Sequence, residues 1–216
     1  MSYLEEKISS HEFICTNEKH NVFLIGDSIR EGYCSVVKEH LSDIANVFYT
    51  EENNRNTQYV ITQLREYHSK FNSPELIDIV HFNCGHWDIA HWNGGAFSLT
   101  SISEYARNLE LIISLIKVLF VNAVIVFATT SPMNPSGEMG VNCRTNKEID
   151  EYNLVARNLC KKNNIPINDI NEYVKDWDAE CYKDYAHLTK SANNVLGKKV
   201  SERLRDVLLD MRLLNE

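Results

Sequence analysis

Two apolar stretches, residues 76–82 and 123–129, constrain the fold of this chain more than any other feature. A strand that is apolar along its length needs cover on both faces. The parallel sheets of α/β proteins provide that cover, because helices pack on both sides of them. Segments with apolar residues at helical spacing lie between the apolar stretches. This alternation predicts an α/β fold with a mostly parallel five-stranded sheet flanked by helices.

The expected elements follow from this pattern. We expect strands at 21–26, 47–50, 76–82, 123–129 and 165–170, and helices at 29–40, 57–71, 101–119, 145–159 and 189–211. No linker, low-complexity segment or internal repeat divides the 216 residues. We therefore expect a single domain, preceded by a polar extension at residues 1–20.

Charge and hydropathy narrow the choice of partners. A net charge of −8 argues against a nucleic-acid partner, since proteins that bind polyanions present a basic surface. The long apolar stretch at residues 109–128 carries Glu110 and Lys117, so we expect no membrane span. The polar N-terminus lacks the features of a secretory signal, which favours a cytoplasmic protein that acts on a small molecule. The oligomeric state is not predicted by any pattern in the sequence.

Metal and redox chemistry are not expected. The six cysteines have no Cys-x-x-Cys spacing, which predicts free thiols. His81, His86 and His91 recur every five residues, a period that fits neither one face of a helix nor one face of a strand. We therefore expect no metal site and no cofactor, and interpret this segment as a polar, aromatic loop beside the cleft.

Three residues together have the chemistry of a hydrolytic triad. Ser28 follows an apolar strand in the turn Gly26-Asp27-Ser28, and Asp184 and His187 stand three residues apart before the last helix. A serine hydroxyl becomes a nucleophile when a histidine takes its proton, and a carboxylate on the other ring nitrogen orients that histidine. Taken singly, Ser28 also fits a helix N-cap, and the other two fit a polar loop.

Position in the predicted sheet supports the triad. Ser28 and the segments 83–88 and 129–135 each follow a predicted strand. In parallel sheets the ligand binds beyond the carboxyl ends of the strands. We therefore expect these three segments to border one cleft.

The chain resembles the SGNH, or GDSL, hydrolases. Gly26-Asp27-Ser28 is similar to the first block of that family, and the Asp184-x-x-His187 motif is similar to its last block. Residues 144–153 resemble the helix before the fifth strand in bacterial members. The resemblance implies a three-layer, flavodoxin-like fold and serine esterase chemistry, with Ser28, Asp184 and His187 as the catalytic residues.

Two departures from the family pattern concern the oxyanion hole. The third block of the family reads Gly-x-Asn-Asp, whereas this chain has Gly85-His86-Trp87-Asp88. The second block has a glycine, whereas this chain has none between Gly32 and Gly85. The expected donors are the Ser28 and Gly85 N–H groups and an asparagine amide, for which Asn54 is the first choice and Asn53 or Asn56 the alternatives. Further candidates for substrate binding are Asp27, Trp87, Asp88 and Trp92.

These observations predict a serine esterase that cleaves small O-acyl esters through an acyl-serine intermediate. The family resemblance makes an O-acetylated carbohydrate the leading candidate substrate. Two alternatives remain open at this stage. One is an acyltransferase that uses the same triad, and the other is a weakly active binding domain with a degraded oxyanion hole.

Overall fold

A five-stranded parallel sheet forms the centre of the molecule. The computed structural model describes residues 12–137 and 140–213. The strand order is β2-β1-β3-β4-β5, and every neighbouring pair is parallel. The strands are β1 (His20–Ile25), β2 (Ala45–Tyr49), β3 (Ile79–Phe82), β4 (Val124–Ala128) and β5 (Ile167–Asn168). The prediction of a parallel five-stranded sheet is confirmed.

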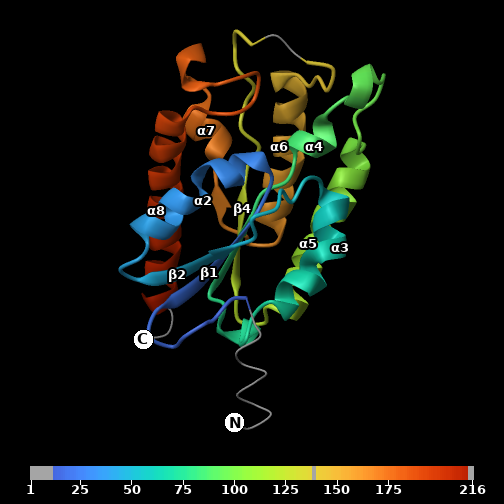
Figure 1. The fold of residues 1–216 in the computed structure, drawn as a ribbon. Coiled ribbons are helices and arrows are strands. Elements are labelled where there is room, and N and C mark those ends of the chain that lie inside the picture. The colour runs from blue at the N-terminus through green and yellow to red at the C-terminus, as the bar shows by residue number, and fades with distance from the viewer. Residues whose placement is uncertain (1–11, 138–139, 214–216) are drawn as a thin grey trace.

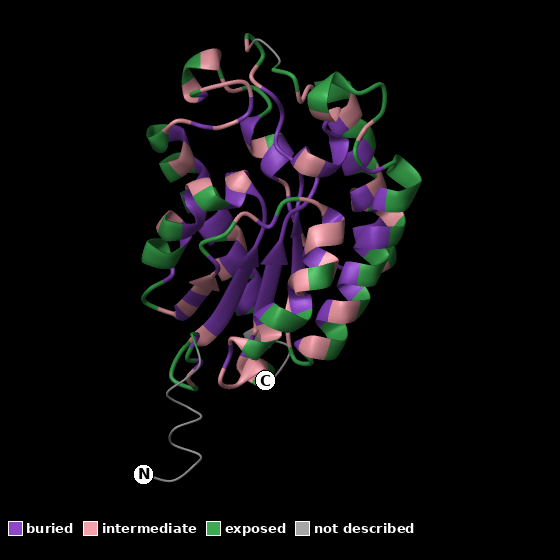
Figure 2. Ribbon diagram, turned by 45° about the vertical axis from the view of Figure 1, so that its right-hand side comes forward, coloured by how far each residue is buried: buried purple, intermediate pink, exposed green. Residues whose placement is uncertain are grey.

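Helices cover both faces of the sheet. Figure 1 shows α2 (Ser28–His40) and α8 (Lys190–Leu213) together on one side, and α3 (Thr57–Ser69) and α5 (Ile102–Leu119) on the other. The second side also carries α6 (Asn146–Lys162), and each side encloses its own apolar core. The sheet between them is largely buried, as Figure 2 shows. The three-layer arrangement expected from the sequence is therefore confirmed.

The structure adds short elements that periodicity did not predict. These are α4 (His86–Ile89), α7 (Ile170–Val174) and three 3₁₀ turns, η1 (Pro74–Leu76), η2 (Trp92–Gly94) and η3 (Ala179–Cys181). The third strand begins at Ile79 because the proline-initiated turn η1 occupies the start of the expected range. The fifth strand ends at Asn168 because the Asp169 side chain accepts from the Glu172 N–H and starts α7.

A buried arginine ties α2 to the loop after β2. The Arg30 guanidinium donates to the carbonyl oxygens of Thr50 at 2.8 Å, Glu52 at 2.6 Å and Gly26 at 3.4 Å. Its side chain is almost wholly inaccessible to solvent. Arg30 thus fixes the start of α2 relative to the segment that carries the asparagine cluster.

Helices α2 and α8 approach closely at two glycines. A Cβ atom added to Gly197 of α8 would lie 2.6 Å from the Cβ of Val36, and one added to Gly32 of α2 would meet the Asn193 side chain amide. The Asn193 amide can turn away, whereas the branched Val36 Cβ cannot move without the helix. The absence of a side chain at Gly197 therefore sets the distance between the two helices.

Surface and thiol properties complete the description. All six cysteines are free, as the sequence predicted, and those at positions 15, 34, 84 and 160 are buried.

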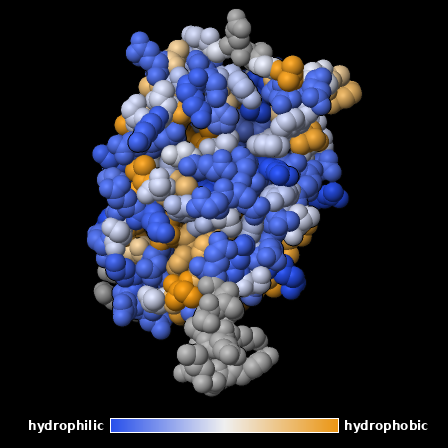
Figure 3. All heavy atoms as spheres, viewed as in Figure 1, coloured by the Kyte–Doolittle hydropathy of each residue, from blue (hydrophilic) through white to orange (hydrophobic). Residues whose placement is uncertain are grey.

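Among the described residues no helix is both long and apolar enough to cross a membrane. On the face viewed in Figure 3, hydrophilic residues predominate and apolar residues form small separate patches.

We predict that Gly197→Ala lowers the free energy of unfolding by about 1–3 kcal/mol, because the new methyl group must push α8 away from α2. This loss should outweigh the gain of about 1 kcal/mol in helix propensity. Chemical denaturation measures the change, and Lys198→Ala, at the next and exposed position of α8, is the matched control. A Gly197→Ala protein at least as stable as the wild type would contradict this account of the packing.

Candidate active site

The three predicted triad residues form one hydrogen-bonded chain. The Ser28 Oγ lies 2.8 Å from the His187 Nε2, and the His187 Nδ1 lies 2.9 Å and 3.0 Å from the two Asp184 carboxylate oxygens. An ionised carboxylate can only accept, so Nδ1 carries the ring proton and Nε2 accepts from the Ser28 hydroxyl. This is the arrangement in which a histidine can remove the serine proton.

Asp27 places Ser28 at the start of a helix. The Asp27 side chain accepts from the Ile29 N–H at 3.0 Å and from the Asn83 Nδ2 at 3.0 Å, and it is the N-cap of α2. Ser28 is the first helical residue, so its N–H lacks an intrahelical acceptor. Asp27 is almost wholly buried and does not line a described pocket. Its prediction as a substrate-binding residue is therefore wrong, since its carboxylate is used in capping.

A short hairpin holds Asp184 and His187. An antiparallel bridge joins Tyr182 to Leu188, and the Lys183 N–H donates to the His187 carbonyl at 2.9 Å. The loop after β4 supports this hairpin, because the Asn134 Nδ2 donates to the Asp184 carbonyl at 3.2 Å. The carbonyl groups of Asp184 and His187 are thus each held by a hydrogen bond.

Asp184 is held in its ionised form. Partial burial raises its pKa, but hydrogen bonds from the His187 and Ala186 N–H groups and from the His187 ring outweigh burial and bring the pKa below its ordinary value. The two backbone bonds measure 2.8 Å and 2.9 Å. An ionised Asp184 can keep His187 in the reactive tautomer and stabilise the imidazolium that forms during attack.

The predicted third oxyanion donor, Asn54, is used elsewhere. Its Nδ2 donates to the Tyr67 hydroxyl at 2.7 Å and to the Thr50 Oγ1 at 3.3 Å, and its Oδ1 accepts from the Gly26 N–H at 2.7 Å. The side chain is buried beneath the loop. Its assignment to the oxyanion hole is therefore wrong, because both amide hydrogens are already bonded within the protein.

Asn53 and Asn56, the alternative candidates for the third oxyanion donor, have different surroundings. The Asn56 side chain caps α3 by accepting from the Tyr59 N–H. The Asn53 side chain lines the same pocket as Ser28 and His187. Its Oδ1 accepts from the Arg55 N–H at 2.8 Å, while its Nδ2 makes no hydrogen bond to any described residue. Arg55 has φ 50, the left-handed conformation that a glycine adopts most easily.

The Gly85-His86-Trp87-Asp88 block starts α4. Gly85 is its N-cap, and a Cβ atom added there would lie 1.9 Å from the Thr130 Oγ1, so packing requires glycine. Gly85 is not among the residues that line the pocket beside Ser28, whereas Trp87 is. The rings of Trp87 and Trp92 lie 4.7 Å apart, centre to centre, and both border that pocket.

The Asp88 side chain binds the first residue of α3 and does not line the cleft. It is fully buried, and it accepts from the Thr57 hydroxyl at 2.6 Å and from the Thr57 N–H at 3.1 Å. Its prediction as a substrate-binding residue is therefore wrong. Burial raises the pKa of Asp88 to about 6, although the hydrogen bonds from Thr57 act in the opposite direction.

The three histidines of the 81–91 segment point to different surroundings. His81 lies within the sheet beside Asn168, His86 contacts the Ser131 hydroxyl at 3.0 Å, and His91 pairs with Glu148 at 2.6 Å. Within the described parts of the chain, no group of three or more His, Cys, Asp or Glu side chains could hold a metal ion.

Two hollows meet at the Ser28–His187 pair. One is a pocket of about 140 Å³, which we call the tryptophan pocket, lined by Ser28, Ile29, Asn53, His86, Trp87, Trp92, Asn142, Arg144, Tyr185, Ala186 and His187. The other measures about 280 Å³ and is bordered by Glu31, Lys183 and Asn193. It shares residues with a wider hollow of about 970 Å³ between α2 and α8, and we call the two together the polar groove. The two halves of an ester could therefore lie on either side of the serine.

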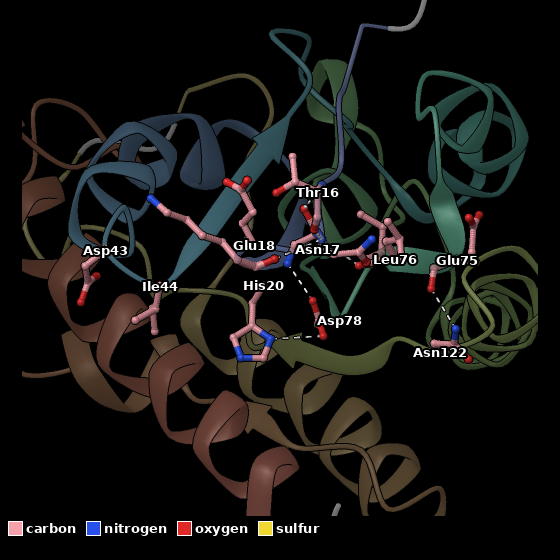
Figure 4. Close-up of a pocket in the computed structure, with 13 residues that line it drawn as sticks. Thr16, Asn17, Glu18, His20, Asp43, Ile44, Glu75, Leu76, Asp78 and Asn122 are labelled. Atoms are coloured by element: carbon pink, nitrogen blue, oxygen red, sulfur yellow. Dashed lines mark hydrogen bonds and ion pairs between the residues drawn. The ribbon is translucent and has the colours of Figure 1, made fainter. Parts of the chain in front are cut away.

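Another hollow, of about 520 Å³, lies at the amino ends of β1 and β3 (Figure 4). Its polar side chains bond to their neighbours: Asp78 accepts from the Asn21 N–H at 2.7 Å and pairs with His20 at 3.2 Å, and Asn122 donates to the Glu75 carbonyl. None of the triad residues lines it. We assign it no part in the chemistry.

Sequence reasoning missed several residues of the tryptophan pocket. Arg144, Asn142 and Tyr185 come from loops, where no periodic pattern fixes the direction of a side chain. The sequence does indicate that the backbone of Arg144 is well ordered, because Arg144 directly precedes Thr145, the N-cap of a helix with a full capping box.

Comparison with known proteins places these features in context. No family model matches the chain. A GDSL esterase/lipase of Arabidopsis thaliana is 22% identical over 139 residues, which cover 56% of this chain. The matched region spans only 58% of the plant protein.

Solved structures resemble the whole fold. A GDSL-like lipase from Bacteroides thetaiotaomicron has a TM-score of 0.68 at 15% identity, over 95% of this chain and 96% of its own. A carbohydrate acetylesterase from Sinorhizobium meliloti has a TM-score of 0.66 at 13% identity, over 88% and 100%. A catalytic variant of an acetylxylan esterase from Geobacillus stearothermophilus has a TM-score of 0.65 at 16% identity, over 85% and 93%. The resemblance to the SGNH/GDSL hydrolases is confirmed, and the chain has their fold.

We predict that Asp88→Asn changes how stability depends on pH. The pKa of Asp88 is about 6 in the folded protein, above the value of about 3.9 for an unfolded chain. Its contribution to the free energy of unfolding is therefore largest below about pH 4 and is lost as the pH rises through about 6. Between pH 4 and pH 7 the wild type should therefore lose about 2–3 kcal/mol of unfolding free energy relative to Asp88→Asn, because asparagine does not ionise.

Chemical denaturation at a series of pH values measures this difference. Asp150→Asn, at an exposed position of α6, is the matched control. A difference between Asp88→Asn and wild type that stays constant across the series would show that Asp88 is not destabilised by burial.

Proposed function

We propose that this protein is a serine esterase that cleaves short O-acyl esters, with O-acetyl groups on carbohydrate as the favoured substrates. The observation that carries the proposal is the hydrogen-bonded chain from Ser28 through His187 to Asp184. Acetylesterases that act on xylan and other carbohydrates are among the solved structures with this fold, which supports the choice of substrate.

The proposed reaction has two halves. The Ser28 Oγ attacks the ester carbonyl carbon while the His187 Nε2 takes the hydroxyl proton. The tetrahedral intermediate then expels the alcohol, which receives that proton from Nε2, and leaves an acyl group on Ser28. Water attacks the acyl-serine with His187 again as base, and the products are the free acid and the regenerated Ser28 hydroxyl.

The oxyanion of both intermediates needs hydrogen-bond donors. We assign the Ser28 N–H, because it is an unbonded group at the start of α2 and lies beside the reacting oxygen. The Gly85 N–H remains the second proposed donor by family resemblance. We assign the Asn53 Nδ2 as the third, since Asn53 lines the pocket and this group makes no bond to the described residues.

The shape of the site favours a short acyl group. The tryptophan pocket, at about 140 Å³, holds only a small substituent. The polar groove is wider, but its walls include Glu39, Lys183 and Lys190, so a long apolar chain would bury little apolar surface there. A sugar hydroxyl and its ring would find hydrogen-bond partners in the same groove.

The experiment that tests the proposal is a series of aryl esters from acetate to octanoate, with kcat/KM measured for each. We expect turnover of acetate and propionate and a graded fall with chain length, because one methylene in a pocket is worth about 1–3 kcal/mol. Ser28→Ala should lower turnover by several orders of magnitude at an unchanged thermal midpoint. Absence of turnover with every ester, or turnover unaffected by Ser28→Ala in a folded protein, would refute the esterase. A rise from acetate to octanoate would refute the short-acyl preference alone.

A second prediction separates the two neighbouring asparagines. Asn53→Ala should lower kcat on the order of a hundredfold with little change in the thermal midpoint, because it removes one oxyanion donor. Asn54→Ala should instead lower the midpoint, because it leaves the buried Gly26 N–H and the Tyr67 hydroxyl without their partners. Wild-type kcat in Asn53→Ala would exclude Asn53 from the oxyanion hole.

A further inference from the structure

The tryptophan pocket contains a buried arginine that forms no ion pair with a described residue. Arg144 lies between β4 and α6, and its side chain is 7% exposed. It borders the pocket together with Ser28 and His187. The proposed hydrolysis of a neutral acetyl ester gives this guanidinium no role.

The contacts of Arg144 satisfy only part of its hydrogen-bonding capacity. Its Nη1 donates to the His86 carbonyl at 2.6 Å, and the guanidinium carbon lies 5.7 Å from the centre of the Tyr185 ring. Its Nε has no hydrogen-bond partner. Among the described residues, no carboxylate oxygen lies within ion-pairing distance of it.

Other arginines in the chain show what a purely structural role looks like. Arg157 pairs with Asp169 at 2.7 Å and Arg205 pairs with Asp43 at 2.9 Å. Arg30, which is also buried, donates to three carbonyl oxygens and lies away from the tryptophan pocket. Arg144 differs from all three, because it lies in the wall of the tryptophan pocket and neither forms an ion pair with a described carboxylate nor donates to several carbonyl oxygens.

A buried, uncompensated cation is unfavourable unless something neutralises it during function. Removing a charge from water costs several kcal/mol in a folded protein, about as much as many proteins have in total stability. Burial accordingly lowers the pKa of Arg144, and neighbouring groups such as Tyr185 and Asp27 offset this only in part.

A carboxylate on the substrate would offset the cost of burying this charge. The guanidinium fork matches a carboxylate in shape and charge, and such pairs are among the strongest hydrogen bonds in proteins. Because the pocket measures about 140 Å³, the carboxylate must stand close to the ester carbonyl in the same molecule. His86 does not compete as a cation, since burial and the nearby charges of Arg144 and His187 hold its pKa well below the ordinary value.

We propose that Arg144 binds a carboxylate of the substrate in the tryptophan pocket, so that the enzyme prefers acidic esters. This inference rests on the proposed esterase function. The carboxylate belongs to the half of the ester that enters the tryptophan pocket. With the acyl half there, as described above, it is the half-ester of a short dicarboxylic acid; with the ester bound in the reverse direction, it is an O-acetylated sugar acid. The chemistry that Arg144 recognises is the same in both.

Two matched substrate pairs test the proposal and identify the half. For the alcohol side, kcat/KM is compared for para-acetoxybenzoate and the neutral para-acetoxybenzamide. For the acyl side, it is compared for monoethyl succinate and ethyl succinamate. We expect the acidic member of at least one pair to be preferred. Arg144→Gln should reduce that acid-to-amide ratio about 10- to 100-fold, as expected for loss of a charge-assisted hydrogen bond.

Arg55→Gln is the matched control. Arg55 is an exposed cation two residues from Asn53, it does not line the pocket, and its replacement removes the same charge. The acid-to-amide ratio should survive in Arg55→Gln and be lost in Arg144→Gln. Equal turnover of acid and amide in both pairs would overturn the proposal while leaving the esterase function intact. An equal fall of acid and amide turnover in Arg144→Gln would also overturn it, because Arg144 would then act on the oxyanion or on packing.

A binding measurement keeps the proposal testable if no ester is turned over. Titration calorimetry on the Ser28→Ala protein should detect para-acetoxybenzoate binding more tightly than para-acetoxybenzamide. Adding Arg144→Gln should abolish the difference, whereas adding Arg55→Gln should not. Equal affinity for acid and amide in the Ser28→Ala protein would refute the carboxylate site independently of catalysis.

Discussion

The close packing of α2 against α8 is the constraint on which the active site depends. Ser28 is the first residue of α2, and His187 stands three residues before the first residue of α8. The two residues are far apart in sequence, and only the approach of the helices brings their side chains to 2.8 Å. Gly197 allows that approach, because a Cβ atom there would meet the Cβ of Val36 and the backbone of Tyr33. The relative position of Ser28 and His187, the proposed nucleophile and base, is therefore set by packing in the core.

Buried amide side chains hold the loops at the carboxyl ends of the strands. Asn54 fixes the loop after β2 to Gly26 and Tyr67, and Asn153 bonds both the N–H and the carbonyl of Thr130 after β4. Each of these side chains satisfies backbone groups that would otherwise be buried without partners. Polar residues near the site thus divide into a group that builds the loops and a smaller group that borders the pocket.

The fold and the proximity of Ser28, His187 and Asp184 could be predicted from the sequence, whereas the surroundings of the other candidate site residues could not. Apolar strands and helical periodicity can be predicted because the pattern of apolar residues follows the pattern of burial in the folded protein. Asp184 and His187 could be predicted to meet because they are only three residues apart. The predictions for Asp27, Asn54 and Asp88 were wrong because a polar side chain beside a motif serves a cap or a backbone group as readily as a ligand. Arg144 was missed because its direction is set by loop contacts to His86 and Tyr185.

We expect that the packing of α2 against α8 makes the Ser28 hydroxyl reactive, and a fluorophosphonate probe reports this reactivity. The probe reacts with a serine only when a base removes its proton, and the adduct can be located by peptide mass spectrometry. We expect one adduct, on the peptide that contains Ser28, with labelling lost in Ser28→Ala and strongly slowed in His187→Ala. A folded protein that stays unlabelled, or that is labelled at another residue, would show that Ser28 is not activated by His187.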